Sequence, residues 1–97
     1  SVNYDFEWDP AKAKVNRQKH GVGFEHAVTV FRDPRAVSVF DDTHSRAEDR
    51  WITLGVSAAG GLLVVHHTLE EIEGNTVRIR IFSSRKATKN EADQYGG

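Results

Sequence analysis

Residues 76–86 read Thr-Val-Arg-Ile-Arg-Ile-Phe-Ser-Ser-Arg-Lys, and this stretch decides the fold. Apolar and charged residues alternate along it, in the order Val77, Arg78, Ile79, Arg80, Ile81 and Phe82. A period of two is typical of a half-buried β-strand, because successive side chains point to opposite faces. The stretch therefore predicts a strand whose three β-branched residues join the core of a sheet.

The other face of this strand carries Arg78 and Arg80 side by side, and Arg85 and Lys86 follow near its end. Like charges on one sheet face repel, so the stability of the fold alone does not favour this pattern. A phosphate or carboxylate ligand would neutralise the guanidinium groups, whose geometry suits both. The alternative is a solvated face whose arginines meet Asp or Glu on neighbouring strands, and the spacing leaves both interpretations open.

The same period of two extends upstream as far as Ala36. It predicts four main strands: Ala36–Asp41, Arg50–Ser57, Leu62–Leu69 and Thr76–Phe82. A further short strand is predicted at Asn3–Trp8, where Tyr4, Phe6 and Trp8 would share one face. Gly60-Gly61 and Glu73-Gly74-Asn75 are typical of tight hairpin turns. Short connections favour antiparallel neighbours, so we expect an α+β fold with a four- to five-stranded antiparallel sheet.

Helix signals lie at both ends of the chain. Asp9 suits an N-cap, Pro10 suits the first helical position, and Gly21 suits the left-handed position after a helix. An amphipathic i, i+3, i+4, i+7 spacing predicts a second N-terminal helix, and polar residues favour one more at the C-terminus. The predicted ranges are Asp9–His20, Phe24–Arg32 and Ala87–Gln94. We expect the helices to cover one face of the sheet.

The composition bounds the functional classes. A chain of 97 residues with 38% hydrophobic and 28% charged residues predicts one folded domain, residues 1–97. It has no cysteine, which excludes disulfides, thiolate metal sites and a cysteine nucleophile. A net charge of −1 argues against coating of nucleic acid by bulk electrostatics, so a basic site must be local. Neither a membrane span nor a signal-peptide pattern is apparent, and we expect a cytoplasmic protein without membrane contact.

Residues 41–50, Asp-Asp-Thr-His-Ser-Arg-Ala-Glu-Asp-Arg, form the densest polar segment. His44 could exchange protons near neutral pH, Glu48 could orient it or share the transfer, and Arg50 could hold an anion. A solvated loop is the alternative interpretation of this spacing.

Other candidate residues have simpler alternatives. His44, His66 and His67 suggest a zinc site on paper, but adjacent strand residues point to opposite faces, so we expect no metal site. One member of the His66-His67 pair should face the arginine side and the other should be a hydrogen-bonded core histidine. Lys19 and His20 could bind an anion, or could simply be cations that favour a helix C-terminus.

Several motifs, taken together and in order, resemble the BrnT toxins of bacterial type II toxin–antitoxin pairs. The matching residues are Phe6-Glu7-Trp8-Asp9, Lys12, Asn16, Lys19-His20-Gly21-Val22, Phe24, Phe31, Asp33-Pro34, Asp42, His44-Ser45, Glu48, Arg50, Gly55, Arg78-Ile79-Arg80-Ile81, Ser83, Arg85-Lys86-Ala87, Glu91 and Tyr95. Phe82-Ser83-Ser84 departs slightly, since the family more often has Ile-Ser-Ala there.

The resemblance implies a RelE-like ribonuclease fold, with helices on one sheet face and RNA cleaved on the other. It implies a ribbon-helix-helix antitoxin as the partner, and contact with operator DNA only through that antitoxin. We expect no cofactor.

Metal-free RNA cleavage needs a base for the 2′-hydroxyl, cations for the phosphorane and an acid for the leaving 5′-oxygen. The candidate catalytic residues are His44, Glu48, Arg50, Arg78, Arg80 and Arg85. The candidate RNA-binding residues are Lys19, His20, Trp51, His67 and Lys86, of which His20 and His67 are also reserves for proton transfer. Trp51 is expected either to stack a base on the open face or to be a covered core residue.

A rival interpretation is a non-catalytic interaction module whose arginine face docks an acidic partner segment. Substitution of Arg80 would then weaken binding to a partner, whereas in a ribonuclease it would abolish toxicity and leave antitoxin binding intact.

Overall fold

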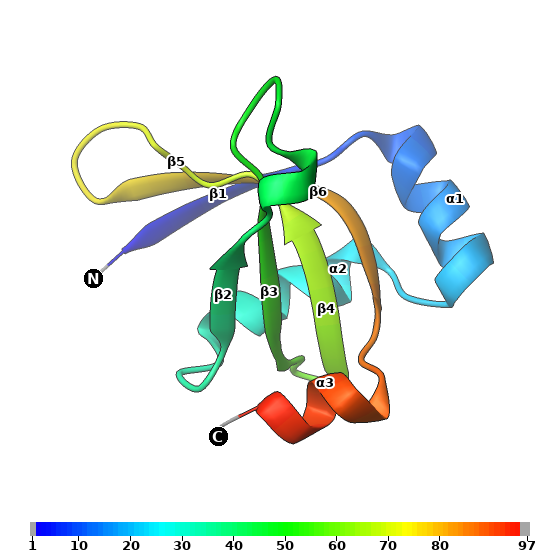
Figure 1. The fold of residues 1–97 in the computed structure, drawn as a ribbon. Coiled ribbons are helices and arrows are strands. Elements are labelled where there is room, and N and C mark those ends of the chain that lie inside the picture. Colours follow the sequence, from blue (N-terminus) through cyan, green and yellow to red (C-terminus); the bar gives the residue numbers. More distant parts are fainter. Residues whose placement is uncertain (1, 96–97) are drawn as a thin grey trace.

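The structure of the protein, a computed structural model, describes residues 2–95. Figure 1 shows a twisted sheet with helices against it. The elements in chain order are β1 (Asn3–Glu7), α1 (Pro10–His20), α2 (Phe24–Ala27), the 3₁₀ helix η1 (Val28–Arg32), β2 (Val37–Phe40), the 3₁₀ helix η2 (Asp42–His44), β3 (Trp51–Val56), β4 (Leu62–His67), β5 (Glu70–Glu71), β6 (Thr76–Lys86) and α3 (Lys89–Gln94). The predicted α+β class and most predicted elements are confirmed.

The sheet is mixed, with strand order β1-β6-β4-β3-β2 and with β5 pairing β6. Strands β2, β3, β4 and β6 are antiparallel neighbours, and β5 is antiparallel to β6. Strand β1 runs parallel to β6, with Asn3 opposite Thr76 and Glu7 opposite Arg80. The prediction of a wholly antiparallel sheet is therefore wrong for β1. Turn signals constrain only strands joined by hairpins, and helices separate β1 from the next strand.

The predicted second helix is not one continuous α-helix. It is α-helical over α2 and becomes a 3₁₀ helix over η1. Three consecutive β-branched residues, Val28, Thr29 and Val30, stand at this change, and such residues lose side-chain freedom in an α-helix. The Thr29 hydroxyl also donates to the His26 carbonyl and accepts from the Ala58 amide, which ties the segment to the loop after β3.

Helix α1 lies along the part of β6 that follows the end of its pairing with β1. Asp9 caps its start by accepting from the Ala11 amide, and Gly21 ends it in the left-handed conformation with φ 70°. The buried Asn16 amide donates to the carbonyls of Val22 and Ser84, and its Oδ1 accepts from the Ser84 amide. Pairing with β1 ends at Arg80, so Asn16 supplies the hydrogen bonds that a neighbouring strand would otherwise make.

One sheet face packs against α1, α2 and η1. The core consists of apolar residues from α2, η1, β4 and β6 and from the loop before α2, namely Val22, Phe24, Ala27, Val30, Leu63, Val65, Ile79 and Ile81. Side chains of the opposite face, which we call the outer face, include those of Arg78 and Arg80, because they alternate with the buried Ile79 and Ile81. Among residues 2–95 no helix has the length and apolarity required to cross a bilayer.

Candidate functional site

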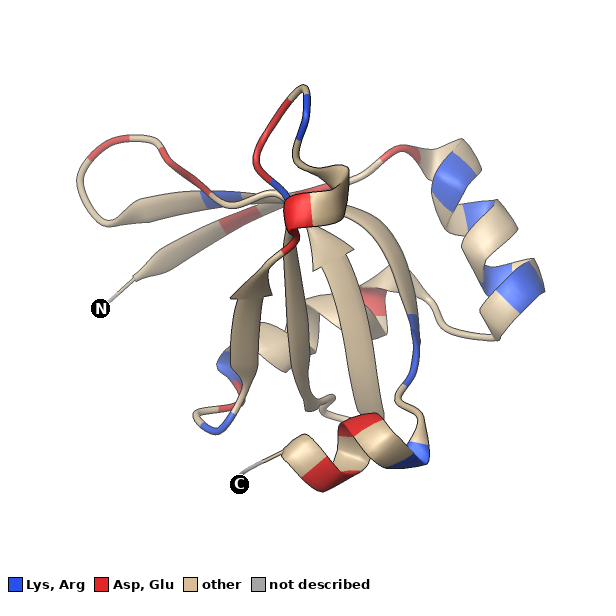
Figure 2. Ribbon diagram, in the orientation of Figure 1, with Lys and Arg blue, Asp and Glu red and all other residues tan. Residues whose placement is uncertain are grey.

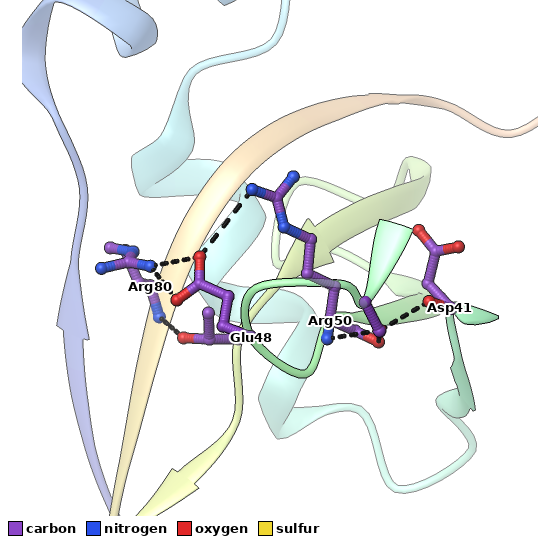
Figure 3. Close-up of polar contacts among 6 residues, drawn as sticks. Asp41, Glu48, Arg50 and Arg80 are labelled. Atoms are coloured by element: carbon purple, nitrogen blue, oxygen red, sulfur yellow. Dashed lines mark hydrogen bonds and ion pairs between the residues drawn. The ribbon is translucent and has the colours of Figure 1, made fainter. Parts of the chain in front are cut away.

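The loop between β2 and β3 is held in shape by its own hydrogen bonds. The Asp41 amide donates to the Arg50 carbonyl at 2.8 Å, which ties the two ends of the loop together. The Ser45 hydroxyl donates to the Asp41 carbonyl and accepts from the Arg50 amide at 2.9 Å. These contacts fix the segment that carries Glu48 and Arg50 over the outer face of the sheet (Figure 3).

Glu48 lies between two guanidinium groups (Figure 3). Nη2 of Arg80 donates to both carboxylate oxygens of Glu48, at 2.7 and 2.5 Å. Nη2 of Arg50 lies 3.8 Å from Oε1 of the same carboxylate. The Arg80 amide in turn donates to the Thr68 hydroxyl, which fixes the β6 backbone at this point. The arrangement brings Glu48, Arg50 and Arg80 together, as the sequence-based hypothesis proposed.

The ring of Phe82 lies against the guanidinium groups of this site, and Phe82 was not among the predicted site residues. The guanidinium carbon of Arg50 lies 4.1 Å from the ring centroid, that of Arg80 lies 5.2 Å away, and Nζ of Lys12 lies 5.5 Å away. The β4–β6 register shifts here, because His66 pairs with Ser83 whereas His67 pairs with Ile81. We refer to Glu48, Arg50, Arg80 and Phe82 as the outer-face cluster.

Two histidines belong to the outer face. Nδ1 of His44 lies 2.9 Å from a carboxylate oxygen of Asp41, and its side chain is 63% exposed. His66 is half-buried, and burial followed by the positive charge of Arg85 lowers its pKa below the ordinary 6.5. The charges of Asp41 and His44 also act on His66. A lowered pKa leaves His66 neutral near pH 7 and able to accept a proton.

His67 was predicted to contact RNA, and the structure corrects this. Its side chain is 0% exposed, with Nε2 2.6 Å from the Thr53 hydroxyl and Nδ1 2.7 Å from the Thr68 carbonyl. Burial lowers its pKa to about 4. His67 is therefore the hydrogen-bonded core member of the histidine pair, and His66 is the member on the arginine side.

Trp51 does not lie on the outer face either. It pairs with His67 across β3 and β4, and directly opposed residues point to the same side of a sheet. Its ring meets that of Phe40 edge-on, with the centroids 5.4 Å apart. Of the two interpretations that the sequence left open, the structure therefore favours the covered one.

Arg78 is surrounded by carboxylates. Its Nε lies 3.3 Å from Asp5 and 3.9 Å from Glu7 on β1, and its Nη1 lies 3.9 Å from Glu70 on β5. This is the solvated, ion-paired face that the sequence offered as the alternative to a ligand site. Arg78 thus neighbours Arg80 along β6 but has a separate set of partners.

Arg85 anchors the C-terminal helix. Its Nη1 and Nη2 each donate to one oxygen of Glu91 at 2.8 Å, and this pair lowers the pKa of Glu91 to about 2. Glu91 also accepts from the Thr88 amide as part of a capping box at the start of α3. The Tyr95 hydroxyl, one turn further on, donates to Asp33 and raises the pKa of the tyrosine. These contacts give Arg85 a positioning role for α3.

The remaining predicted cations lie at α1 and at the end of β6. Lys19 and His20 line a pocket with Lys12 and Phe82, whereas Lys86 is exposed at the last pair of the ladder with β4. His66 and His67 point to opposite sides of the sheet, so they do not combine with His44 as a zinc site. Residues 2–95 contain no group of three or more His, Cys, Asp or Glu side chains arranged to hold a metal ion.

Comparisons with known proteins give the same family as the sequence motifs. Residues 8–91 match the family described as the ribonuclease toxin, BrnT, of type II toxin–antitoxin systems. A solved structure, the Brucella abortus ribonuclease toxin BrnT, superposes with a TM-score of 0.61 and 21% sequence identity, covering 90% of this chain and 100% of that one. No curated protein sequence matches the chain significantly. The family match spans both the outer-face cluster and most of the fold, and this chain therefore belongs to the BrnT family of ribonuclease toxins of type II toxin–antitoxin systems.

Proposed function

We propose that this protein is an endoribonuclease that cleaves RNA without a metal ion at the outer-face cluster. The observation that carries the proposal is the convergence of Arg50 and Arg80, from a loop and from β6, on the carboxylate of Glu48. Two guanidinium groups aimed at one anion are also the arrangement that stabilises the negative charge of a pentacoordinate phosphorane. Glu48 lies at the position between the two guanidinium groups that such an anion would take.

For proton transfer the proposal names His66 and His44, two histidines whose charges act on one another. A neutral imidazole takes the proton from the 2′-hydroxyl, which attacks the adjacent phosphorus, and a protonated group returns a proton to the departing 5′-oxygen. His66, whose pKa is lowered, suits the first step. His44, which contacts Asp41 and is largely exposed, suits the second, and Glu48 orients or shares the transfer.

The partner of a type II toxin is an antitoxin, and we propose the ribbon-helix-helix type, with operator DNA contacted only by the complex. The fold is related in this proposal to the RelE-like ribonucleases. An antitoxin that covers the outer face would block the cluster directly. Because the net charge is −1, tight binding should depend on local complementarity more than on overall charge.

The test is incubation of the purified, antitoxin-free protein with total RNA in the presence of EDTA. Wild-type protein should cleave, and Arg80→Ala should cut the cleavage rate by roughly 10²–10³-fold, the usual effect of losing one charge-stabilising donor. Arg17→Ala is the matched control, since it removes a guanidinium that pairs with Glu25 on the exposed side of α1, away from the outer-face cluster. Cleavage that disappears with EDTA and returns with a divalent ion would contradict the metal-free mechanism.

The interaction-module alternative makes a different prediction in the same experiment. If the face only docks a partner, neither protein cleaves RNA and Arg80→Ala loses antitoxin affinity. A ribonuclease cleaves RNA in its wild-type form, and its Arg80→Ala variant loses cleavage by a much larger factor than it loses antitoxin affinity.

A further inference from the structure

A pocket of about 350 Å³ lies between α1 and the part of β6 that follows the β1 ladder. Apolar side chains of Ala11, Val15 and Phe82 form its walls, and Lys12, Lys19 and His20 stand around it. The volume is within the range of about 300–1,000 Å³ that is typical of small-ligand sites. Val15, which would be expected to be covered if it only served the core, is 59% exposed.

The pocket and the outer-face cluster share one side chain, Phe82. Its ring lines the pocket and has the guanidinium groups of Arg50 and Arg80 close to it, together with the ammonium group of Lys12. Figure 2 shows the basic residues that run along α1 beside this part of β6. An aromatic ring among cations is the combination that binds single-stranded nucleic acid, because bases stack on the ring while phosphates meet the charges.

We propose that this pocket is a nucleotide subsite, which holds a base next to the cleaved phosphate on Phe82 and Val15 and the neighbouring phosphate on Lys12 and Lys19. The inference rests on the proposed ribonuclease function and extends it to the binding of the substrate strand. An RNA strand then runs from the outer-face cluster across Phe82 and along α1.

The hydrogen bonds of Asn16 determine what kind of recognition this subsite provides. Asn16 lines the pocket, but both hydrogens of its amide are engaged by the carbonyls of Val22 and Ser84, and its oxygen accepts from the Ser84 amide. It therefore has little capacity left to read the edge of a base. Because Asn16 is already engaged, the subsite should discriminate among bases mainly by how strongly they stack, with His20 and Ser83 as the other polar residues of the lining beside the lysines.

The experiment measures the affinity of a fluorescein-labelled 2′-O-methyl octaribonucleotide, which cannot be cleaved, by anisotropy at several salt concentrations. Val15→Glu places a carboxylate one turn from Lys12 and Lys19 and neutralises them without disturbing the core. It should lower the affinity by about 5- to 100-fold, the loss expected for one stacked base and its phosphate contacts. Lys19→Ala should reduce the slope of log K against log[salt] by about 0.7.

Lys14→Ala is the matched control, because it removes a lysine of the same helix that does not line this pocket. It should bind the oligonucleotide within twofold of wild type. Circular dichroism of each variant checks that α1 is intact.

The outcomes separate this inference from the proposed function. If Val15→Glu and Lys19→Ala bind and cleave RNA like wild type while Arg80→Ala does not cleave, the subsite is wrong and the ribonuclease proposal stands. If wild type neither binds the oligonucleotide nor cleaves total RNA, both fail. If the pocket variants lose affinity for the antitoxin alone, the pocket is a protein-docking site and the nucleotide subsite is overturned.

Discussion

Both carboxylate oxygens of Glu48 accept hydrogen bonds from one nitrogen of Arg80, Nη2, so the carboxylate caps the guanidinium group from one side. An RNA phosphate that approaches Arg80 must compete with this carboxylate. Glu48 therefore has two roles in the proposal: it weakens the binding of an anion at Arg80, and it is a candidate for proton transfer. One substitution tests both, because the first role affects RNA affinity and the second affects the cleavage rate.

Glu48→Gln should raise the affinity for a non-cleavable RNA and lower the cleavage rate. Removing one exposed ion pair changes binding by up to about 1 kcal/mol, so a two- to fivefold gain in affinity is expected. Loss of a proton-transfer group should lower the rate by roughly 10²-fold or more. Anisotropy and a cleavage assay measure the two quantities, and Glu73→Gln, which removes a carboxylate from the distant β5–β6 turn, is the control. Unchanged cleavage would limit Glu48 to its electrostatic effect.

Arg78→Ala should reduce cleavage far less than Arg80→Ala, by fivefold or less against roughly 10²–10³-fold. The reason is that three carboxylates, those of Asp5, Glu7 and Glu70, surround Arg78, whereas Arg80 shares the single carboxylate of Glu48 with Arg50, which leaves this pair of guanidinium groups with a net positive charge. Initial rates on one RNA substrate compare the two variants directly. If the two variants lost the same factor in cleavage rate, Arg78 would contribute to catalysis as much as Arg80 despite its three acidic neighbours.

Asn16→Ala should destabilise the protein by about 2–4 kcal/mol. The substitution leaves the buried amide and carbonyl of Ser84 without their side-chain partner, and each unsatisfied buried polar group costs about 1–3 kcal/mol. Urea denaturation followed by fluorescence of the two tryptophans measures the free energy of unfolding. Asn90→Ala on the exposed face of α3 should change it by about 0.5 kcal/mol or less.

The stability should fall as the pH is lowered from 6.5 to about 4. Burial lowers the pKa of His67 from the ordinary 6.5 to about 4 in the folded state, so over this window the unfolded chain binds a proton that the folded chain does not. Unfolding is thereby favoured by roughly 3 kcal/mol, at about 1.4 kcal/mol per pKa unit. Denaturation at pH 7.5, 6, 5 and 4 measures this slope, and His67→Gln should reduce it, while His66, whose pKa burial also lowers, continues to contribute. The Arg85–Glu91 pair contributes in a different window, because the Glu91 pKa of about 2 affects stability only below pH 4.5.

The sequence predicted the elements of this fold better than their spatial relations. Alternation in residues 76–82 correctly placed Ile79 and Ile81 inside and Arg80 outside, since the period of a strand is a local property. The direction of β1 could not be predicted in the same way, because it depends on how two helices carry the chain past the sheet. The 3₁₀ conformation of η1 had a visible signal in its β-branched residues, which the amphipathic spacing outweighed in the prediction.

The candidate site shows the same division. Glu48 and Arg50 were found from the polar density of one loop, and their contact with Arg80 follows from how that loop folds back over the outer face. The histidine pair was correctly predicted to split between the two faces, but the wrong member, His67, was assigned to RNA. Which member is buried depends on the register of β4 against β6, and the sequence does not reveal that register. Phe82 alternates with Arg78 and Arg80, so its outward position was readable, but its cation neighbours come from Lys12 and Arg50 in distant segments.

Strand β6 pairs with elements far from it in sequence: Asn3 of β1 lies opposite Thr76, and Asn16 of α1 bonds to Ser84 across 68 residues. Contacts of such long range form late and slowly during folding. On a ribosome, the strand that carries Arg80 and Phe82 is synthesised after β1 and α1, and both of these elements lack their β6 partner until it emerges. A nascent chain that has not yet reached β6 therefore lacks the assembled arginine face, even though Glu48 and Arg50 have already been synthesised.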